Sequence, residues 1–362
     1  MSSFTAAPRI IGTEPVLPQH RYPQQQLTDA FADFVGVDGP RKRLLQKVHG
    51  NAAVQYRHLA LPIEKYADLQ DFDTANDAFI NEATALTDTA LRRALEHGGV
   101  QPDEVELIMT ATTTGLSVPS LEARIAPAAG IRPDVRRLPV VGLGCVAGAA
   151  GVARVADYLV GHPDHVAVLL SVELCSLTLQ RSDTSTANLI ASGLFGDGAA
   201  AVVMAGSRRA ESLRGPGPAP RIVASRSRLY PHTERAMGWD VGASGLRIVL
   251  GAEIPELVRR ELRTDVEGFL SDLGLSLSDI GFWLCHPGGP KVLQAVEETL
   301  ELRHGELDVT WESLAEIGNI SSASVLHVLA DTMDRRTPQL DSYGLMLALG
   351  PGFSLELVLL QV

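Results

Sequence analysis

The sequence predicts an α/β fold built from two similar halves. In each half a helix leads through an aspartate-bearing turn into a strand, and a glycine-containing loop then leads to a helix rich in small residues. The separation from the Asp103 turn to Cys145 nearly equals the separation from the Asp279 turn to Asn319. One pattern repeated in this way indicates an internal duplication, and a pseudo-twofold axis would bring Cys145 and Asn319 toward one central site.

Length and composition indicate a globular protein with a substantial core. The 362 residues are 45% hydrophobic and 20% charged, and the formal net charge of −12 argues against a nucleic-acid partner, which needs a basic face. Residues 1–8 lack the segments of a secretory signal, and the apolar run 166–172 is too short to span a membrane. We therefore expect a cytoplasmic protein. The three cysteines show neither metal-ligand spacing nor a disulfide framework, which leaves thiols free for chemistry.

The first part of the chain is predicted to contain two helices and a strand. Helical spacing covers residues 23–34 and 73–97, and a turn after the second helix leads into the buried strand 105–110. Residues 41–47 form a basic stretch between the helices. A charge run is usually a solvated helix face, but in an acidic protein it is also where a phosphate-bearing ligand is expected.

The segment 136–161 contains the strongest candidate for a nucleophile. A short apolar stretch ends in a Gly142-Leu143-Gly144 turn, and a small-residue helix is predicted over 146–160. Cys145 lies at the start of this helix, where unpaired backbone N–H groups and the positive end of the helix dipole favour a thiolate. We therefore expect Cys145 to be a nucleophile with a lowered pKa.

Two other interpretations of this segment are a structural cysteine and a dinucleotide-binding turn. Buried free cysteines are common as small hydrophobic residues. The glycines at 142, 144 and 148 approximate a phosphate-binding fingerprint, but the spacing differs by one residue. Such a fingerprint also belongs to the first strand of a βαβ unit, whereas a long segment precedes this one. The dinucleotide interpretation is therefore the weaker of the two.

The rest of the chain continues the first half and then repeats its pattern. A strand at 166–172 is followed by a glycine turn at 194–198 that enters another strand. An Arg, Gly, Pro and Ser-rich stretch at 208–220 suggests a boundary, so we divide the chain into halves 1–215 and 216–362. The second half is predicted to contain helices over 256–273, 290–300 and 318–333, and strands over 280–285, 343–349 and 353–360.

Several motifs, in order along nearly the whole chain, resemble those of type III polyketide synthases, the chalcone synthase family. They are Gly144-Cys145, Leu194-Phe195-Gly196-Asp197-Gly198, His286-Pro287-Gly288-Gly289-Pro290, Gly318-Asn319-Ile320-Ser321-Ser322-Ala323 and Gly350-Pro351-Gly352. The resemblance implies a thiolase-like five-layered αβαβα fold, a homodimer, coenzyme A thioesters as substrates, and no cofactor or metal. The stretches 142–154, 172–178 and 322–329 are most similar to mycobacterial-type long-chain α-pyrone synthases.

The resemblance also implies a catalytic set of Cys145, His286 and Asn319. Cys145 would take the starter acyl group from coenzyme A, paired with His286 as an imidazolium. His286 and Asn319 would then donate hydrogen bonds to the malonyl thioester and stabilise the enolate that forms as carbon dioxide leaves. Taken alone, His286 would be interpreted as a core histidine and Asn319 as a helix N-cap.

Other family positions fall on residues that would shape the substrate cavity. Phe195 occupies the position of a gating phenylalanine, and Thr113, Thr178 and Ser321 keep the family residue types. Four positions depart from the chalcone-type pattern: Ile248 replaces a second gating phenylalanine, Cys175 a threonine, Trp239 a small glycine, and Val118 a methionine that reaches across the dimer.

The four departures affect which starter the cavity would accept, and the basic stretch contains candidate coenzyme-binding residues. Ile248 and Trp239 disfavour aromatic starters, whereas Cys175 and Val118 would open a channel for an alkyl chain. In the coenzyme-binding helix Lys47 matches the family pattern, and Arg43 and Arg57 are further candidates.

The sequence therefore predicts a synthase that condenses a medium- or long-chain fatty acyl-CoA with malonyl-CoA and releases alkyl α-pyrones. One alternative is a type III synthase of alkylresorcinols or other aromatic polyketides, although tetrahydroxynaphthalene synthases carry an extra cysteine where this chain has Thr113. Another is a β-ketoacyl synthase III-like enzyme of fatty-acid synthesis, in which Gln-Ala-Asn rather than Pro-Gly-Gly-Pro follows the histidine. A catalytically silent thiolase-fold binding protein would be expected to lose one of the three catalytic residues, and none is lost.

Overall fold

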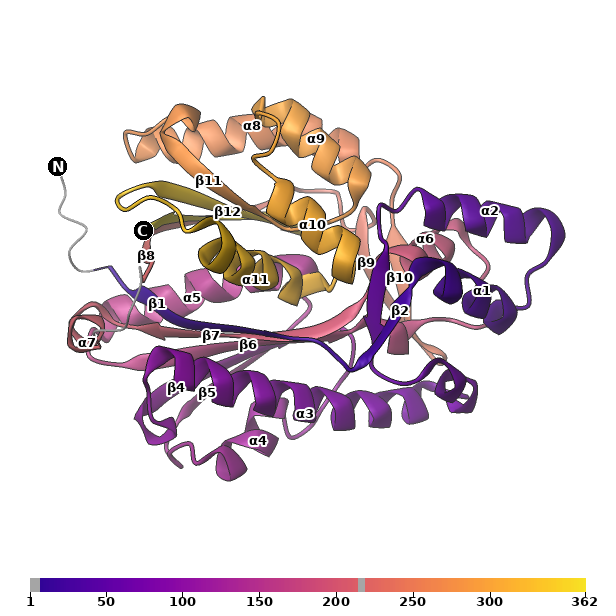
Figure 1. Ribbon diagram of the computed structural model, residues 1–362, viewed down its shortest axis with the longest axis horizontal. Coiled ribbons are helices and arrows are strands. Elements are labelled where there is room, and N and C mark those ends of the chain that lie inside the picture. The colour runs from indigo at the N-terminus through magenta and orange to yellow at the C-terminus, as the bar shows by residue number, and fades with distance from the viewer. Residues whose placement is uncertain (1–6, 214–218) are drawn as a thin grey trace.

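The computed structural model describes residues 7–213 and 219–362, which form one continuous nine-stranded sheet (Figure 1). Between the fourth and fifth strands of the sheet only Arg221 and Arg9 pair, so the sheet folds over there into two layers. In order across the sheet, the strands are β11 (Ile280–Cys285), β12 (Tyr343–Gly350), β13 (Ser354–Gln361), β8 (Arg221–Leu229), β1 (Arg9–Val16), β7 (Asp197–Ala205), β6 (Val166–Leu174), β4 (Val105–Thr112) and β5 (Arg136–Val141).

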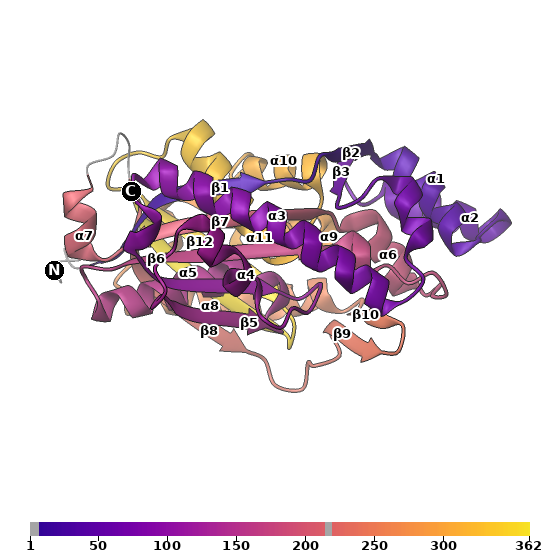
Figure 2. The same ribbon diagram turned by 90° about the horizontal axis from the view of Figure 1, so that it is seen from below.

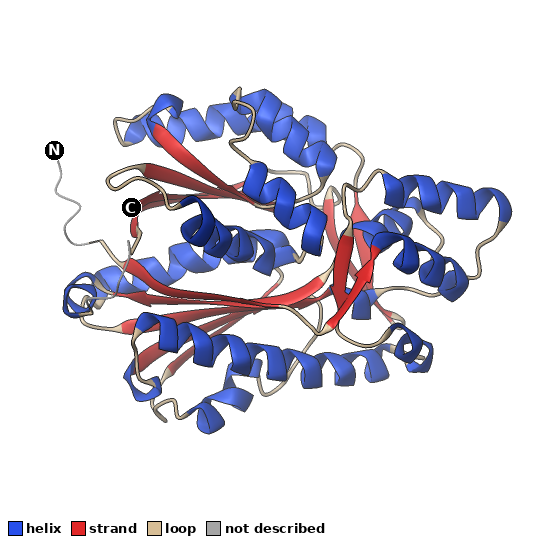
Figure 3. Cartoon of the chain, viewed as in Figure 1, coloured by secondary structure: helices blue, strands red, loops and turns tan. Residues whose placement is uncertain are grey.

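Helices lie outside and between the two sheet layers and complete the five predicted layers (Figure 3). Helices α3 (Phe72–Gly98) and α4 (Leu121–Ala129) cover the outer face of the first half. Helices α8 (Ile254–Asp272) and α9 (Pro290–Leu300) cover that of the second half. The middle layer contains α5 (Ala147–Gly161), α11 (Ser321–Asp331) and the shorter α10 (Asp308–Ile317).

The strand pairing confirms the internal duplication. In the first half β4 is parallel to β6, β6 is antiparallel to β7, and β7 is antiparallel to β1. The second half repeats this order with β11, β12, β13 and β8. Within the described residues, β5 has no counterpart in the second half and lies exposed at the sheet edge. The predicted boundary between residues 215 and 216 lies outside the described residues.

The helices of the middle layer meet at small residues, which explains the glycine and alanine content of α5. A Cβ atom at Gly148 would lie 2.3 Å from the carbonyl oxygen of Ser322 on α11, and one at Gly151 would lie 2.5 Å from the side chain of Leu169. Only glycine permits such close packing. The close approach brings the N-terminal ends of α5 and α11 together in the centre of the molecule.

A group of smaller elements extends from one end of the layered body (Figure 2). Among its members, the helix α6 and the hairpin β9–β10 were not predicted from the sequence. The group consists of α1 (Gln24–Val35), α2 (Gly39–Gly50), α6 (Thr186–Leu194), and the hairpins β2 (His20–Pro23) with β3 (Tyr56–Leu59) and β9 (Met237–Gly242) with β10 (Gly245–Leu250).

Short elements join the larger ones. The stretch predicted as a boundary loop at 208–220 starts within the short helix α7 (Ser207–Ser212). In the described part of the chain no helix is long and apolar enough to cross a membrane. The remaining helical turns are η2 (Ile63–Asp68), η3 (Pro102–Glu104), η4 (Gly144–Val146), η5 (Cys175–Thr178), η6 (Leu277–Asp279) and η7 (Thr332–Arg336).

Candidate active site

Cys145 lies in a turn that only glycine can build, at the junction between β5 and α5. Gly142 and Gly144 both have positive φ, at 97° and 54°. A Cβ atom at Gly144 would lie 2.6 Å from the ring of Pro351, so the loop of the second half packs directly on the turn that holds Cys145. Cys145 follows in η4 and is 7% exposed. The sequence prediction of a cysteine at the start of a buried helix is confirmed.

His286 and Asn319 come from equivalent positions in the second half. His286 directly follows β11, is 3% exposed, and neither of its ring nitrogens has a hydrogen-bond partner. Asn319 is 1% exposed and precedes α11. Its Oδ1 accepts a hydrogen bond of 2.8 Å from the backbone N–H of Ser321, which leaves the amide NH₂ as the donor of this side chain.

Burial favours a neutral thiol at Cys145 and a neutral imidazole at His286, contrary to the expectation of a thiolate and an imidazolium. Burial raises the pKa of Cys145 to about 12, although the hydrogen-bonding side chains of Ser321 and Asn319 act to lower it. Burial likewise lowers the pKa of His286 to about 3. A helix start alone therefore does not offset the loss of water around the sulfur. A buried imidazole with two unpartnered nitrogens retains the capacity to bond an incoming group.

Glu173 is a functional candidate that the sequence analysis did not single out. It is buried in β6, and its carboxylate accepts hydrogen bonds from the backbone N–H of Thr113 at 3.0 Å, from Thr114 at 2.8 Å and from Ser322 at 2.5 Å. The pKa of Glu173 is raised, because the effect of burial exceeds the lowering effect of these hydrogen bonds. A single acid inside an apolar strand sequence was the signal that would have identified it.

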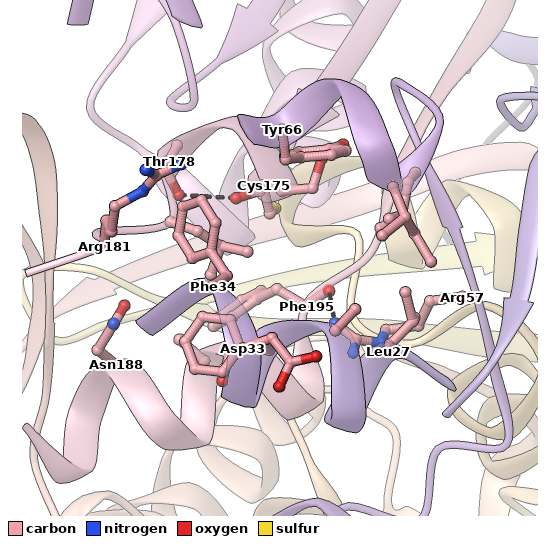
Figure 4. A pocket seen from close by; sticks show the side chains of 18 of the residues that line it. Leu27, Asp33, Phe34, Arg57, Tyr66, Cys175, Thr178, Arg181, Asn188 and Phe195 are labelled. Atoms are coloured by element: carbon pink, nitrogen blue, oxygen red, sulfur yellow. Dashed lines mark hydrogen bonds between the residues drawn. The ribbon is translucent and has the colours of Figure 1, made fainter. Parts of the chain in front are cut away.

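A cavity of about 390 Å³ brings together five of the predicted substrate residues (Figure 4). They come from three elements and their neighbours: η5, the end of α6, and the hairpin β9–β10. The five are Cys175, Thr178, Phe195, Trp239 and Ile248. These five positions therefore lie around one cavity, which Cys145, His286 and Asn319 do not line.

Further parts of the cavity wall come from α1 and η2, which the sequence analysis did not connect with the site. On α1, Leu27, Phe31 and Phe34 lie one helical turn apart and face the cavity. Ile63 and Tyr66 of η2 extend this wall. Such a stripe of apolar side chains is normally a core face, so nothing in the spacing distinguished it from core.

Three predicted substrate residues do not line the cavity. Val118 is 95% exposed in the loop between β4 and α4, so it contributes no wall to the cavity of its own chain. The hydroxyl of Thr113 donates to Glu173 at 3.2 Å. Ser321 lies beside the nucleophile instead, where its Oγ accepts from the Cys145 thiol at 3.6 Å.

The three candidate coenzyme-binding residues separate into two groups. Lys47 and Arg43 are exposed on α2, where the cationic stretch was predicted. Arg57 points inward from β3 and is only 4% exposed. It donates to Gln24 at 3.0 Å and to the carbonyl of Phe195 at 2.8 Å. Arg57 is therefore part of the cavity wall and not of the surface on which Lys47 and Arg43 lie.

Among the described residues no group of three or more His, Cys, Asp or Glu side chains is arranged to hold a metal ion. Cys145, Cys175 and Cys285 are all buried and free. Burial raises the pKa of each of the three thiols. Position, rather than intrinsic acidity, therefore distinguishes Cys145: it alone lies in the turn where the two halves meet.

The fold is that of the thiolase-like class of condensing enzymes, and comparison with known proteins gives the family. Residues 20–214 match the family described as FAE1/Type III polyketide synthase-like protein, and residues 221–362 match the C-terminal domain of chalcone and stilbene synthases. The chain belongs to the type III polyketide synthase family. Members are decarboxylative condensing enzymes that act on coenzyme A thioesters and need no further cofactor.

Individual relatives cover almost the whole chain. The chain is 53% identical over 345 residues to 1,3,6,8-tetrahydroxynaphthalene synthase of Streptomyces peucetius, covering 95% of this chain and 90% of that protein. It is 37% identical to a putative chalcone synthase of Bacillus subtilis, covering 85% and 86% of the two chains. The crystal structure of tetrahydroxynaphthalene synthase from Streptomyces coelicolor superposes with a TM-score of 0.90 at 28% identity, covering 98% and 99%. The sequence motifs had pointed instead to long-chain α-pyrone synthases.

Proposed function

We propose that this type III polyketide synthase loads an aliphatic acyl group from coenzyme A onto Cys145, extends it with malonyl-CoA, and releases alkyl α-pyrones. The apolar cavity beside Cys175 is the observation that carries the proposal. Its α1 wall of Leu27, Phe31 and Phe34 offers hydrocarbon surface to a chain, while polar and charged side chains, Asp33 of α1 among them, line other parts of the cavity. Each buried methylene of such a chain contributes about 0.8 kcal/mol of binding free energy.

The first chemical step is transfer of the starter. The sulfur of Cys145 attacks the thioester carbonyl, its proton passes to His286, and coenzyme A leaves as the thiol. The neutral resting pair suits this order, because the proton moves only when a substrate is present to receive the sulfur. An unpaired thiolate would otherwise be exposed to oxidation between turnovers.

The second step is decarboxylation and condensation. The N–H of the neutral His286 ring and the Asn319 amide donate hydrogen bonds to the thioester oxygen of malonyl-CoA, where negative charge develops as carbon dioxide leaves. The resulting enolate attacks the acyl carbonyl on Cys145, and the Cys145 sulfur departs. An uncharged amide is suited to Asn319's position, because a carboxylate would repel the enolate. The extended chain is now a coenzyme A thioester, and it returns to Cys145 for the second extension. Attack of the enol oxygen of the resulting triketide on its thioester carbonyl then closes a six-membered pyrone and expels coenzyme A as the thiol.

A second candidate function is the condensation of malonyl-CoA alone to tetrahydroxynaphthalene. The 53% identity with the Streptomyces peucetius enzyme of that name favours it. The residue at position 113 argues against this function, because tetrahydroxynaphthalene synthases carry an extra cysteine there and this chain has a threonine. The two functions differ in the starter, so a substrate experiment separates them.

The decisive experiment offers the enzyme acyl-CoAs of increasing chain length together with malonyl-CoA, and malonyl-CoA alone in a parallel reaction. Mass spectrometry of the products should show alkyl pyrones whose masses track the starter. A naphthalene product from malonyl-CoA alone, with acyl-CoAs left unused, would replace the first proposal by the second. Acceptance of aromatic starters only would contradict both.

We also propose that the enzyme is a homodimer whose contact includes the edge strand β5. Leu138 and Val141 on this strand are 43% and 60% exposed, and the neighbouring Val118 is 95% exposed. Apolar side chains grouped on an unpaired strand edge are typical of a surface that is covered by a partner. In this arrangement Val118 would reach toward the partner subunit.

A further inference from the structure

Arg57 is a buried cation for which the proposed mechanism has no use. It extends from β3 into the molecule, where it donates hydrogen bonds to the Gln24 side chain and to the carbonyl of Phe195. A guanidinium is costly to bury unless its donors are satisfied in a fixed geometry. A structural or functional role therefore accounts for the buried charge of Arg57, and the groups around this side chain indicate which role it is.

The surroundings are the C-terminal end of α6, which leads directly into Phe195. Three successive carbonyl oxygens at this helix end accept hydrogen bonds from three different parts of the chain. Gly193 accepts from the side-chain amide of Gln24 at 2.7 Å, Leu194 from the backbone N–H of Asn319 at 2.9 Å, and Phe195 from Arg57 at 2.8 Å. Carbonyls at a helix end lack partners within the helix, and a positive charge there is favourable.

The same end of α6 is joined to Asn319 by backbone pairing. Phe195 and Asn319 form an isolated parallel bridge, and the N–H of Gly196 donates to the Asn319 carbonyl at 2.9 Å. The aliphatic part of Arg57 packs on the other side of this pair, since a Cβ atom at Gly318 would lie 3.1 Å from its Cγ. Arg57 thus bonds to Phe195 and lies close to Gly318, the residue that precedes Asn319.

Asp197 carries a charge opposite to that of Arg57 and fixes the next residue of the segment, although burial raises the pKa of its carboxyl to about 6. Its carboxylate accepts from the backbone N–H groups of Ala60 at 2.7 Å and Ser176 at 2.8 Å, and its negative charge favours the charged form of Arg57. Burial lowers the pKa of Arg57 to about 10, which leaves the guanidinium charged near neutral pH. The segment from Phe195 to Asp197 is therefore fixed at one end by the hydrogen bond from Arg57 and at the other by the hydrogen bonds to the Asp197 carboxylate.

We propose that Arg57 is a positioning residue that sets the placement of Phe195 and, through the bridge between Phe195 and Asn319, the aim of the Asn319 amide at the malonyl thioester. This inference rests on the proposed role of Asn319 in decarboxylation. It assigns Arg57 to the extension step, because the donor that it positions, the Asn319 amide, acts on malonyl-CoA, whereas the Cys145 thiol that performs the loading step donates its own hydrogen bond to Ser321.

Substitution of Arg57, with the two half-reactions measured separately, tests the proposal. Loading is followed as the rate of acyl transfer to the enzyme from acyl-CoA by intact-protein mass spectrometry. Decarboxylation is followed as the conversion of malonyl-CoA to acetyl-CoA. Arg57→Met should slow decarboxylation by a factor on the order of 10 to 10², the cost of misplacing a reacting group by about 1 Å. The rate of loading should change by less than about threefold, which is much less than the expected loss of decarboxylation rate.

Two further variants keep the test interpretable. Arg57→Lys retains the charge but not both hydrogen bonds of the guanidinium, so it should recover part of the decarboxylation rate; it carries the test if Arg57→Met does not fold. Arg21→Met is the matched control. Arg21 lies on the adjacent strand β2, stacks over Tyr56 and pairs with Glu316, and contacts none of the site residues.

The outcomes separate this inference from the function on which it rests. Equal losses of loading and decarboxylation in both Arg57 variants would make Arg57 a purely structural residue and overturn the proposal. Unchanged rates in both would overturn it as well. Failure of the native enzyme to decarboxylate malonyl-CoA would refute the proposed function itself.

Discussion

Substitution of Cys175 with phenylalanine should shift the enzyme from long to short acyl-CoA starters. Cys175 is 4% exposed and lines the cavity of about 390 Å³ that we assign to the alkyl chain. A phenyl ring that excludes about four methylenes would remove roughly 3 kcal/mol of apolar binding, or on the order of 10²-fold in kcat/KM for a long starter. A starter too short to reach the ring should lose little.

The assay is a competition between a short and a long acyl-CoA at equal concentration, with pyrone products counted by mass spectrometry. Cys175→Ser is the matched control, because it removes the thiol without filling the cavity and should keep the native preference. Overpacking by Cys175→Phe would destabilise the protein by about 1–3 kcal/mol. Ala30→Phe, which fills the cavity from another position, therefore provides an independent test. Ala30 lines the same cavity from α1 and is only half-buried. If both bulky variants retain the preference for long starters, the chain lies elsewhere and the cavity assignment is wrong.

Three further predictions concern the nucleophile, the amide donor and the assembly. Burial raises the pKa of Cys145 to about 12 and lowers that of His286 to about 3, so the thiolate fraction of Cys145 should keep rising from pH 7 to pH 10. The rate of Cys145 alkylation by iodoacetamide should rise with it. A plateau of this rate below pH 8 would instead reveal an ion pair between Cys145 and His286. Asn319→Ala should slow malonyl-CoA decarboxylation by about 10²–10³-fold, the cost of one oxyanion donor, while starter loading persists; equal rates would leave Asn319 as a helix cap. Val141→Asp should convert a dimer to a monomer in light scattering, whereas an unchanged mass would move the interface away from β5.

The fold was predictable from the sequence because its signals are local and repeated. The two halves carry the same order of helix, turn and strand, and the pairing of β4, β6 and β7 recurs in the second half. The position of Cys145 was predictable for a related reason. Gly144 must have positive φ and must pack on Pro351, and this requirement is visible in the sequence as a glycine.

What was not predictable depends on contacts between distant parts of the chain. Local context suggested a lowered pKa for Cys145, but burial among residues of both halves raises it. Arg57 belongs to a basic region and was interpreted as a surface ligand, although its hydrogen-bond acceptor at Phe195 lies 138 residues further along the chain. The α1 wall of the cavity has the same spacing as any amphipathic helix, so only the packed structure distinguishes a cavity wall from core.

The most direct test of the account is to identify the residue that carries the acyl group. The enzyme is incubated with a long-chain acyl-CoA in the absence of malonyl-CoA, and the acylated peptide is located by mass spectrometry. We predict a single thioester on Cys145 that is absent in Cys145→Ala and that disappears when malonyl-CoA is added, as an alkyl pyrone is released. Acylation of Cys175 or Cys285, or an acyl-enzyme that malonyl-CoA does not discharge, would contradict the account.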